Sequence, residues 1–210
     1  MTATQLLISS LVTMTVGCRD ASPPPTPPEA TPHAAPAPTA VPTPMLATDS
    51  IYQSSSSWEN QAGETTPLAK LAGHPLVLAM VFTRCQASCP VIMADLKAID
   101  DALTPTERAA MRFVIFTFDA ARDNAASLRE FAEQHHLPLD HWALYHGNAD
   151  AVRELAAMLN VRFAVLPNGG FDHANVITVL DASGVQRFQQ NGLGQEPQAI
   201  VAQLRALLAL

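Results

Sequence analysis

The stretch Val81-Phe82-Thr83-Arg84-Cys85-Gln86-Ala87-Ser88-Cys89-Pro90 joins an apolar run to a helical pattern, and it decides the fold that we expect. Residues 75–82 form a short, continuous apolar run, which is typical of a buried central strand. After Pro90, which suits a first helical turn, apolar residues recur at helical spacing: Ile92, Leu96, Ile99 and Leu103. The sequence therefore predicts two thiols on a strand-to-helix turn.

The position of this thiol pair indicates a site for metal binding or thiol-disulfide chemistry. Both sulfurs lie at or near the predicted N-terminus of a helix, where the helix dipole and the free backbone N–H groups favour thiolate. Thiolate is the form that binds soft metals and attacks disulfides. Two cysteines four residues apart can form a structural disulfide, a metal site or a redox pair. Because so small a loop constrains little of the unfolded chain, a purely structural disulfide is the least favoured of the three.

The rest of the chain alternates between strand and helix patterns. Strands are predicted at 113–118 and 142–145, helices at 125–136, 149–159 and 196–208, and a hairpin at 176–180 and 185–189 with its turn at Ser183-Gly184. This order predicts an α/β, thioredoxin-like fold, in which helices flank a central mixed sheet. The cysteine turn then follows the first long strand, at the N-terminus of the first main helix, where that fold keeps its active site.

Composition divides the chain into three parts. Of the 17 prolines, ten lie between Arg19 and Thr48, so residues 19–49 are expected to be a disordered tether. Residues 1–18 read as a signal peptide, and residues 50–210 suffice for one domain with a core. The net charge of −7 and the lack of a basic patch with interleaved aromatic residues argue against a nucleic-acid partner.

The N-terminal segment indicates export. Residues 6–16 are apolar over about eleven positions, which matches a signal-peptide core and is too short to span a bilayer. The following Val16-Gly17-Cys18 resembles the lipobox of a bacterial lipoprotein, although Thr15 stands where Leu is usual. The resemblance implies that Cys18 is lipidated and that a membrane anchor holds the domain in the bacterial cell envelope, outside the cytoplasm. The alternative is an ordinary secreted or uncleaved leader in which Cys18 has no role.

Three motifs, the cysteine turn among them, carry a family resemblance that covers residues 52–208. Cys85-x-x-x-Cys89-Pro90, the segment Phe118-Asp119-Ala120-Ala121-Arg122-Asp123 and the segment Phe171-Asp172-His173-Ala174 resemble those of the Sco/SenC family. Members of that family are copper-binding, thioredoxin-fold proteins that serve the assembly of copper centres in respiratory oxidases. The resemblance implies a copper site made of Cys85, Cys89 and His173. Gln86 and Ala174 depart from residues that are frequent in the family, but neither is a ligand.

The donor set suits copper on chemical grounds as well. Two thiolates and one imidazole form a soft, three-coordinate set for Cu(I), and such sites also accept Cu(II) with a further ligand or water. Structural zinc sites normally use four protein ligands, and spacing suggests no fourth here. Met80 and Met93 are expected to pack in the core, and Asp119 and Asp172 to be turn or supporting residues. None of the other six histidines is expected to be a ligand. His33 lies in the predicted tether and His74 precedes a strand, whereas the remaining four are expected at solvated or capping positions: His135, His136, His141 and His146.

Three classes of function remain open. The first is a copper metallochaperone that passes copper to an apo oxidase subunit or another copper chaperone. The second is a thiol-disulfide reductase that uses Cys85 and Cys89 as a redox pair to keep the cysteines of a copper site reduced. The third is a peroxidase or redox sensor, although Met80-Val81-Phe82-Thr83 lacks the approach sequence of peroxiredoxins. We rank the chaperone first and the reductase second.

Overall fold

The structure, a computed structural model, describes residues 47–85 and 88–209 of the 210-residue chain. The predicted leader, the lipidation site Cys18 and most of the predicted tether lie outside these residues, and so do Gln86 and Ala87 of the cysteine turn. Within the described part of the chain, no helix has both the length and the apolar character needed to cross a bilayer.

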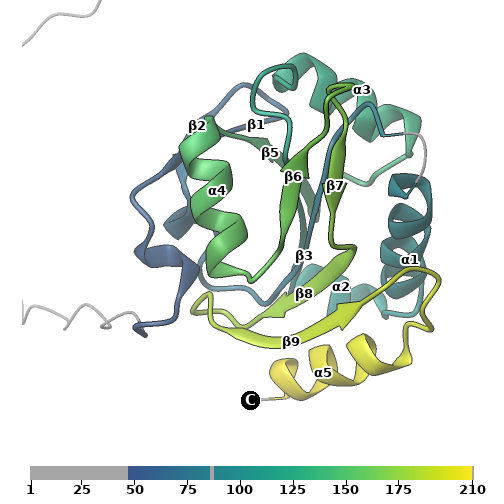
Figure 1. Ribbon diagram of the computed structural model, residues 1–210. Coiled ribbons are helices and arrows are strands. Elements are labelled where there is room, and N and C mark those ends of the chain that lie inside the picture. Colours follow the sequence, from purple (N-terminus) through teal and green to yellow (C-terminus); the bar gives the residue numbers. More distant parts are fainter. Residues whose placement is uncertain (1–46, 86–87, 210) are drawn as a thin grey trace, which may run out of the picture. The chain divides into compact units, whose positions relative to one another are not determined.

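A seven-stranded mixed sheet forms the centre of the domain, with strand order β2-β1-β5-β4-β3-β8-β9 (Figure 1). Its central strands β3, β4 and β5 are parallel, whereas β1, β2, β8 and β9 pair antiparallel with their neighbours. The strands are β1 Ser57–Asn60, β2 Thr65–Pro67, β3 Leu76–Val81, β4 Arg112–Thr117, β5 Trp142–His146, β8 Val176–Leu180 and β9 Gln186–Asn191. This arrangement confirms the predicted α/β, thioredoxin-like fold class.

Helices cover both faces of the sheet, and the alternation of side chains along β3 explains why. Val77, Ala79 and Val81 face a cluster shared with α1 Cys89–Asp101, α3 Ala125–Gln134 and α5 Gln198–Leu208. Leu76, Leu78 and Met80 face a second cluster shared with α4 Ala149–Met158 and the 3₁₀ turns Ile51–Gln53 and Leu68–Leu71. Because both faces are covered, every residue of β3 is buried, as its unbroken apolar sequence predicted. A short helix, α2 Pro105–Ala109, was not predicted.

A second, two-stranded sheet was also missed by sequence reasoning. It pairs β6 Phe163–Val165 with β7 Phe171–His173, and it joins no strand of the larger sheet in the described residues. Figure 1 shows this β6–β7 ribbon between α4 and α1. Three-residue strands are too short to produce a readable alternation of apolar and polar residues. The ribbon matters because His173 is its last residue.

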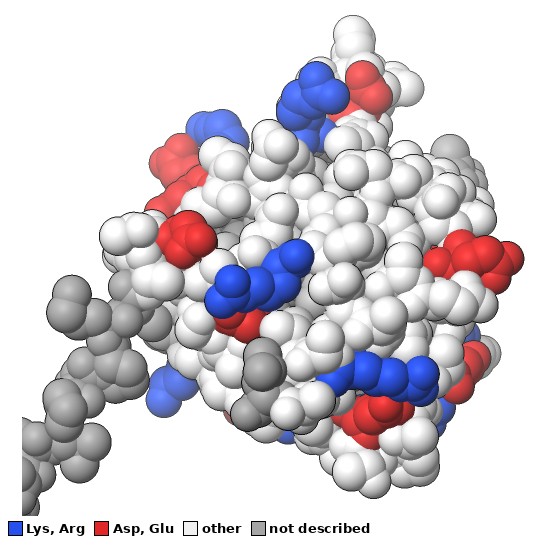
Figure 2. Space-filling model, turned by 90° about the horizontal axis from the view of Figure 1, so that it is seen from below, with Lys and Arg blue, Asp and Glu red and all other residues white. Residues whose placement is uncertain are grey.

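Charged side chains are dispersed over the face that Figure 2 shows. Lys and Arg groups are scattered there, and most of them lie next to Asp or Glu. Two ion pairs from the C-terminal part of the chain illustrate the pattern, since Arg205 pairs with Glu107 and Arg187 with Asp181. Exposed pairs of this kind add little to stability, so the fold depends on its two apolar clusters.

His141 is one of the described histidines that depart from the predicted solvated positions. It is 8% exposed, and its Nε2 atom lies 3.0 Å from the carboxylate of Asp100, while its Nδ1 atom lies 2.9 Å from Asp140. Asp100 also accepts a hydrogen bond from Trp142 Nε1 at 2.8 Å and pairs with Arg108 at 3.1 Å. The buried carboxylate therefore joins the end of α1 to the start of β5, which sequence spacing does not reveal.

Replacing Asp100 by Ala should lower the free energy of unfolding by about 3 kcal/mol, because it leaves buried donors of His141 and Trp142 without an acceptor. Urea unfolding followed by circular dichroism measures the loss. Asp101→Ala is the matched control, since Asp101 is the exposed neighbour on the same helix. Equal midpoints for the two variants would show that the network does not stabilise the fold.

Candidate metal site

Asp123 fixes the backbone at which the cysteine turn begins. Its carboxylate accepts hydrogen bonds from the N–H of Thr83 at 3.1 Å and from Thr83 Oγ1 at 2.5 Å. The hydroxyl of Thr117, the last residue of β4, donates to the same carboxylate. Asp123 is 4% exposed, so these bonds are shielded from water. The ends of β3 and β4 are thus tied together immediately before Cys85.

The first turn of α1 uses a sulfur atom where α2, α3 and α4 use a side-chain oxygen as a cap. Asn124 and Asn148 cap α3 and α4 through their side-chain oxygens, whereas Ser88 makes no side-chain cap bond at α1. Instead, the N–H of Cys89 donates to Cys85 Sγ at 3.3 Å. Helix N-termini leave N–H groups without intrahelical acceptors, and Cys85 supplies an acceptor for one of them. This bond holds the Cys85 sulfur over the start of the helix.

The two thiols occupy different environments. Cys85 is partly exposed, whereas Cys89 is 1% exposed and its Sγ lies 3.8 Å from the carbonyl oxygen of Phe82. Burial raises the pKa of the Cys89 thiol well above its ordinary value. The expectation that the helix N-terminus favours thiolate at both positions is therefore wrong for Cys89, because desolvation of the charged sulfur is the larger effect.

His173, the third residue of the predicted site, is the last residue of β7. The sequence placed it in a loop before a strand; the structure puts it in a short strand of its own, before β8. Its Nδ1 atom lies 3.2 Å from the carbonyl oxygen of Ala174, and its ring packs 5.0 Å from that of Phe118 and 6.1 Å from that of Phe82. A proton on Nδ1 satisfies this contact and leaves Nε2 with its lone pair for a metal.

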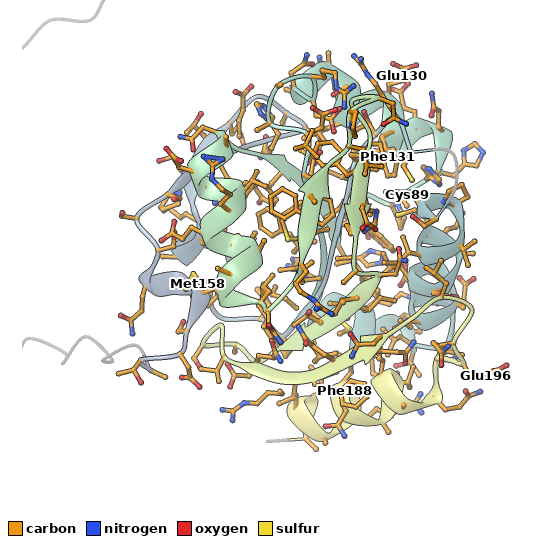
Figure 3. All side chains as sticks on the ribbon, in the orientation of Figure 1. Cys89, Glu130, Phe131, Met158, Phe188 and Glu196 are labelled. Carbon is orange, nitrogen blue, oxygen red and sulfur yellow. The ribbon has the colours of Figure 1, made fainter. Side chains whose placement is uncertain are left out.

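The three side chains meet at one point. One ligand atom from each of Cys85, Cys89 and His173 lies within 4.8 Å of the other two. Two donor atoms that bind one ion at about 2.0–2.3 Å are at most about 4.6 Å apart, so small side-chain rotations bring this set into a single shell. Figure 3 shows Cys89 at the start of α1, on the side of the helix that faces β7. The fold thus brings together residues separated by 84 positions.

The neighbouring polar residues have other partners. Asp119, 2% exposed, pairs with Arg122 at 2.5 Å, and Asp172 is exposed. Met80 and Met93 are buried in the two core clusters, as expected. Sequence reasoning missed the supporting roles of Thr83, Arg122 and Asp123. The sequence marks residues 119–123 as a motif, but only the structure shows which groups their side chains contact.

Two cavities open onto this cluster from different sides. One of about 380 Å³ lies beside Cys85 and is lined in part by Arg84, Ser88, Arg122 and Phe171. The other, of about 400 Å³, lies beside His173 and is lined in part by Arg162 and Asp172. These cavities give an incoming ligand an approach to Cys85 and His173, whereas Cys89 is buried.

The unequal thiols predict unequal reactivity. At pH 8, Cys89 should react with iodoacetamide at least about tenfold more slowly than Cys85, because each unit by which a pKa rises lowers the thiolate fraction about tenfold. Rates are measured by mass spectrometry in Cys85→Ser and Cys89→Ser variants, both carrying Cys18→Ser so that one thiol remains. Similar rates in the two variants would contradict the buried, high-pKa environment of Cys89.

Comparison with known proteins points to the family that the sequence motifs resemble. A model of the SCO1/SenC family matches residues 47–209. The SCO1 protein homolog of Bacillus subtilis (strain 168) is 24% identical over 144 residues, which are 67% of this chain and 74% of that protein.

Solved structures share the fold at low identity. A SCO1/SenC family lipoprotein from Bacillus anthracis superposes with a TM-score of 0.66 at 21% identity, covering 72% of this chain and 92% of that one. ScoI of Arabidopsis thaliana, solved with copper bound, gives a TM-score of 0.62 at 16% identity and covers 73% and 95% of the two chains. Because the family model spans nearly all of the described domain, the chain belongs to the SCO1/SenC family.

Proposed function

We propose that this protein is an extracytoplasmic copper metallochaperone, in which Cys85, Cys89 and His173 bind the ion that is passed on. The observation that carries the proposal is the convergence of two sulfurs and one imidazole within 4.8 Å. Such a donor set prefers copper to hard cations, which favour oxygen ligands. The copper-bound structure of the Arabidopsis thaliana relative supports this choice of metal.

The openness of the cluster suits delivery better than storage. Three protein ligands leave room for a fourth donor from a partner, whereas structural sites are closed by four. The cavities beside Cys85 and His173 give that donor access. Transfer then proceeds by ligand exchange, in which the partner's donors replace those of this protein one at a time. The family resemblance points to an apo copper subunit of a respiratory oxidase, or another copper chaperone, as the recipient.

Anaerobic titration of the reduced protein should show one copper per chain, with sulfur-to-copper charge-transfer bands in the Cu(II) form. Cys85→Ser and Cys89→Ser should each abolish tight binding. His173→Ala should weaken Cu(II) more than Cu(I), because two thiolates hold the softer ion without imidazole. Absorption spectra and metal counting after gel filtration give the result. Unchanged Cu(II) binding by His173→Ala would remove that residue from the proposed site.

The same titration on oxidised protein addresses the reductase alternative. A disulfide between Cys85 and Cys89 has no thiolate to donate, so the oxidised protein should take up no Cu(I) until it is reduced. Reduction should release two titratable thiols in a Cys18→Ser background. If reduced protein bound copper no better than oxidised protein, yet reduced partner disulfides, the reductase function would replace the chaperone function.

We further propose that lipidated Cys18 anchors the domain to a membrane. The lipobox-like sequence and the Bacillus anthracis relative, described as a lipoprotein, support this anchor. A tether of roughly 30 residues in polyproline II form, at about 3.1 Å each, would reach at most about 90 Å, which lets the copper site search for a membrane-bound recipient.

Cys18→Ser should move the protein from the membrane fraction to the soluble fraction without changing copper affinity, because the anchor and the site share no residue. Fractionation with immunoblotting, followed by copper titration, measures both. Membrane association that persists in Cys18→Ser would indicate an uncleaved leader or a protein partner as the anchor.

A further inference from the structure

The residue that supplies the imidazole sits on the least supported part of the sheet structure. His173 ends the β6–β7 ribbon, and the ribbon joins no strand of the seven-stranded sheet within the described residues. A two-stranded ribbon is at best marginally stable by itself. Contacts with the rest of the domain must therefore hold His173 near the thiols, and its position depends on how firmly those contacts hold.

One support is a layer of aromatic rings under the ribbon. Phe163 and Phe171 pack against Phe118, with ring centroids 4.9 and 6.2 Å apart, and Phe171 also packs 5.0 Å from Phe82. These contacts are apolar and carry little directional preference. They cover one side of the ribbon, whose Ala164, Val165 and Asp172 stay exposed, and they include no hydrogen bond that would fix its position.

Arg122 supplies a directional contact at the other end of the ribbon. Its Nη2 group donates a hydrogen bond to the carbonyl oxygen of Gly169, in the turn between β6 and β7. Its Nε group donates to the carboxylate of Asp119 at 2.5 Å. One guanidinium thus connects the turn of the ribbon to the segment that follows β4. Gly169 has a φ of +78°, and a Cβ atom there would lie 3.2 Å from Arg122 Nη1.

The anchor of this contact is itself fixed. Asp119 is 2% exposed; its carboxylate accepts from the backbone N–H of Arg122 at 3.2 Å, and its own N–H donates to Thr117 Oγ1 at 3.0 Å. A buried carboxylate needs a cation close by, so Asp119 restrains the Arg122 side chain. Arg122 in turn restrains the ribbon turn. The side chain is only partly exposed, which limits competition from water.

We propose that Arg122 is a positioning residue, which latches the β6–β7 ribbon so that His173 stays within reach of the metal held by Cys85 and Cys89. Arg122 acts through the ribbon and does not touch the ion. Loss of the latch lets the ribbon shift, and the site then behaves as a two-thiolate site. The inference rests on the proposed copper function for its metal-dependent consequence, but the latch itself does not require copper.

The first test is made on the full chain loaded with one equivalent of Cu(II). Arg122→Gln should raise the rate of Cu(II) dissociation on the order of tenfold, as loss of a residue that orients a metal ligand typically does. Its charge-transfer spectrum should shift toward that of His173→Ala, while Cu(I) binding is retained. Gly169→Ala should also speed Cu(II) dissociation and shift the spectrum, although it changes no charge. Its added Cβ atom crowds the Arg122 guanidinium and disfavours the positive φ at this position.

Arg153→Gln is the matched control. Arg153 lines the same apolar cavity as Arg122, but it is exposed and pairs with Asp150 of its own helix. It should leave the spectrum and the dissociation rate unchanged. The double variant Arg122→Gln/His173→Ala should release Cu(II) no faster than His173→Ala alone, because both changes remove the same ligand. Additive effects of the two substitutions would overturn the latch and indicate that Arg122 acts through its charge.

A second test needs no metal. Hydrogen exchange of the copper-free protein should be faster in residues 163–173 of Arg122→Gln than in wild type, with the core strands β3 and β4 unaffected. Failure of wild type to bind copper would refute the proposed function while leaving this measurement decisive for the latch. Copper binding by wild type, with unchanged exchange and unchanged spectra in Arg122→Gln, would refute the latch alone.

Discussion

The carboxylate of Asp123 is the constraint on which the site depends. By accepting hydrogen bonds from Thr83 and Thr117, it joins the ends of two adjacent parallel strands at the edge where the cysteine turn begins. Each partner is buried or partly buried, so the bonds form in a medium that strengthens them. Because Thr83 is fixed, the position of Cys85 two residues later is closely restricted. Helix α1 begins four residues after Cys85.

Two kinds of support then hold the donor atoms, and they differ in stiffness. Cys89 is the first residue of α1 and belongs to the larger core cluster, against which Cys85 of the preceding turn packs, so Cys89 cannot move without disturbing α1. The imidazole belongs to a ribbon that rests on aromatic rings and on the Arg122–Gly169 contact. This division suits the transfer that we propose, in which the two thiols retain the ion while the imidazole yields its place first.

Sequence reasoning predicted the parts of the fold that rest on local patterns. The strand β3 is readable from its continuous apolar run, the helix α1 from its apolar stripe at helical spacing, and the hairpin from the Ser183-Gly184 turn between two strand patterns. The ribbon β6–β7 and helix α2 escaped because three to five residues do not establish a period. His173 was picked out through its motif, since nothing in its neighbours shows that it meets Cys85 across 88 positions. The pairing of Asp100 with His141 and the hydrogen bond of Arg122 to the Gly169 carbonyl depend on tertiary contacts that composition does not encode.

The burial of Cys89 beneath Cys85 and His173 imposes an order of events. In the transfer that we propose, a recipient's donor atom meets the partly exposed sulfur or the imidazole first, since these border the two cavities. The sulfur of Cys89 is then the last ligand to dissociate, and in that step it is the one remaining bond between the ion and this protein. In the proposed transfer, departure is thus decided at the innermost ligand, because an incoming donor reaches the buried Cys89 sulfur only after the outer ligands have yielded.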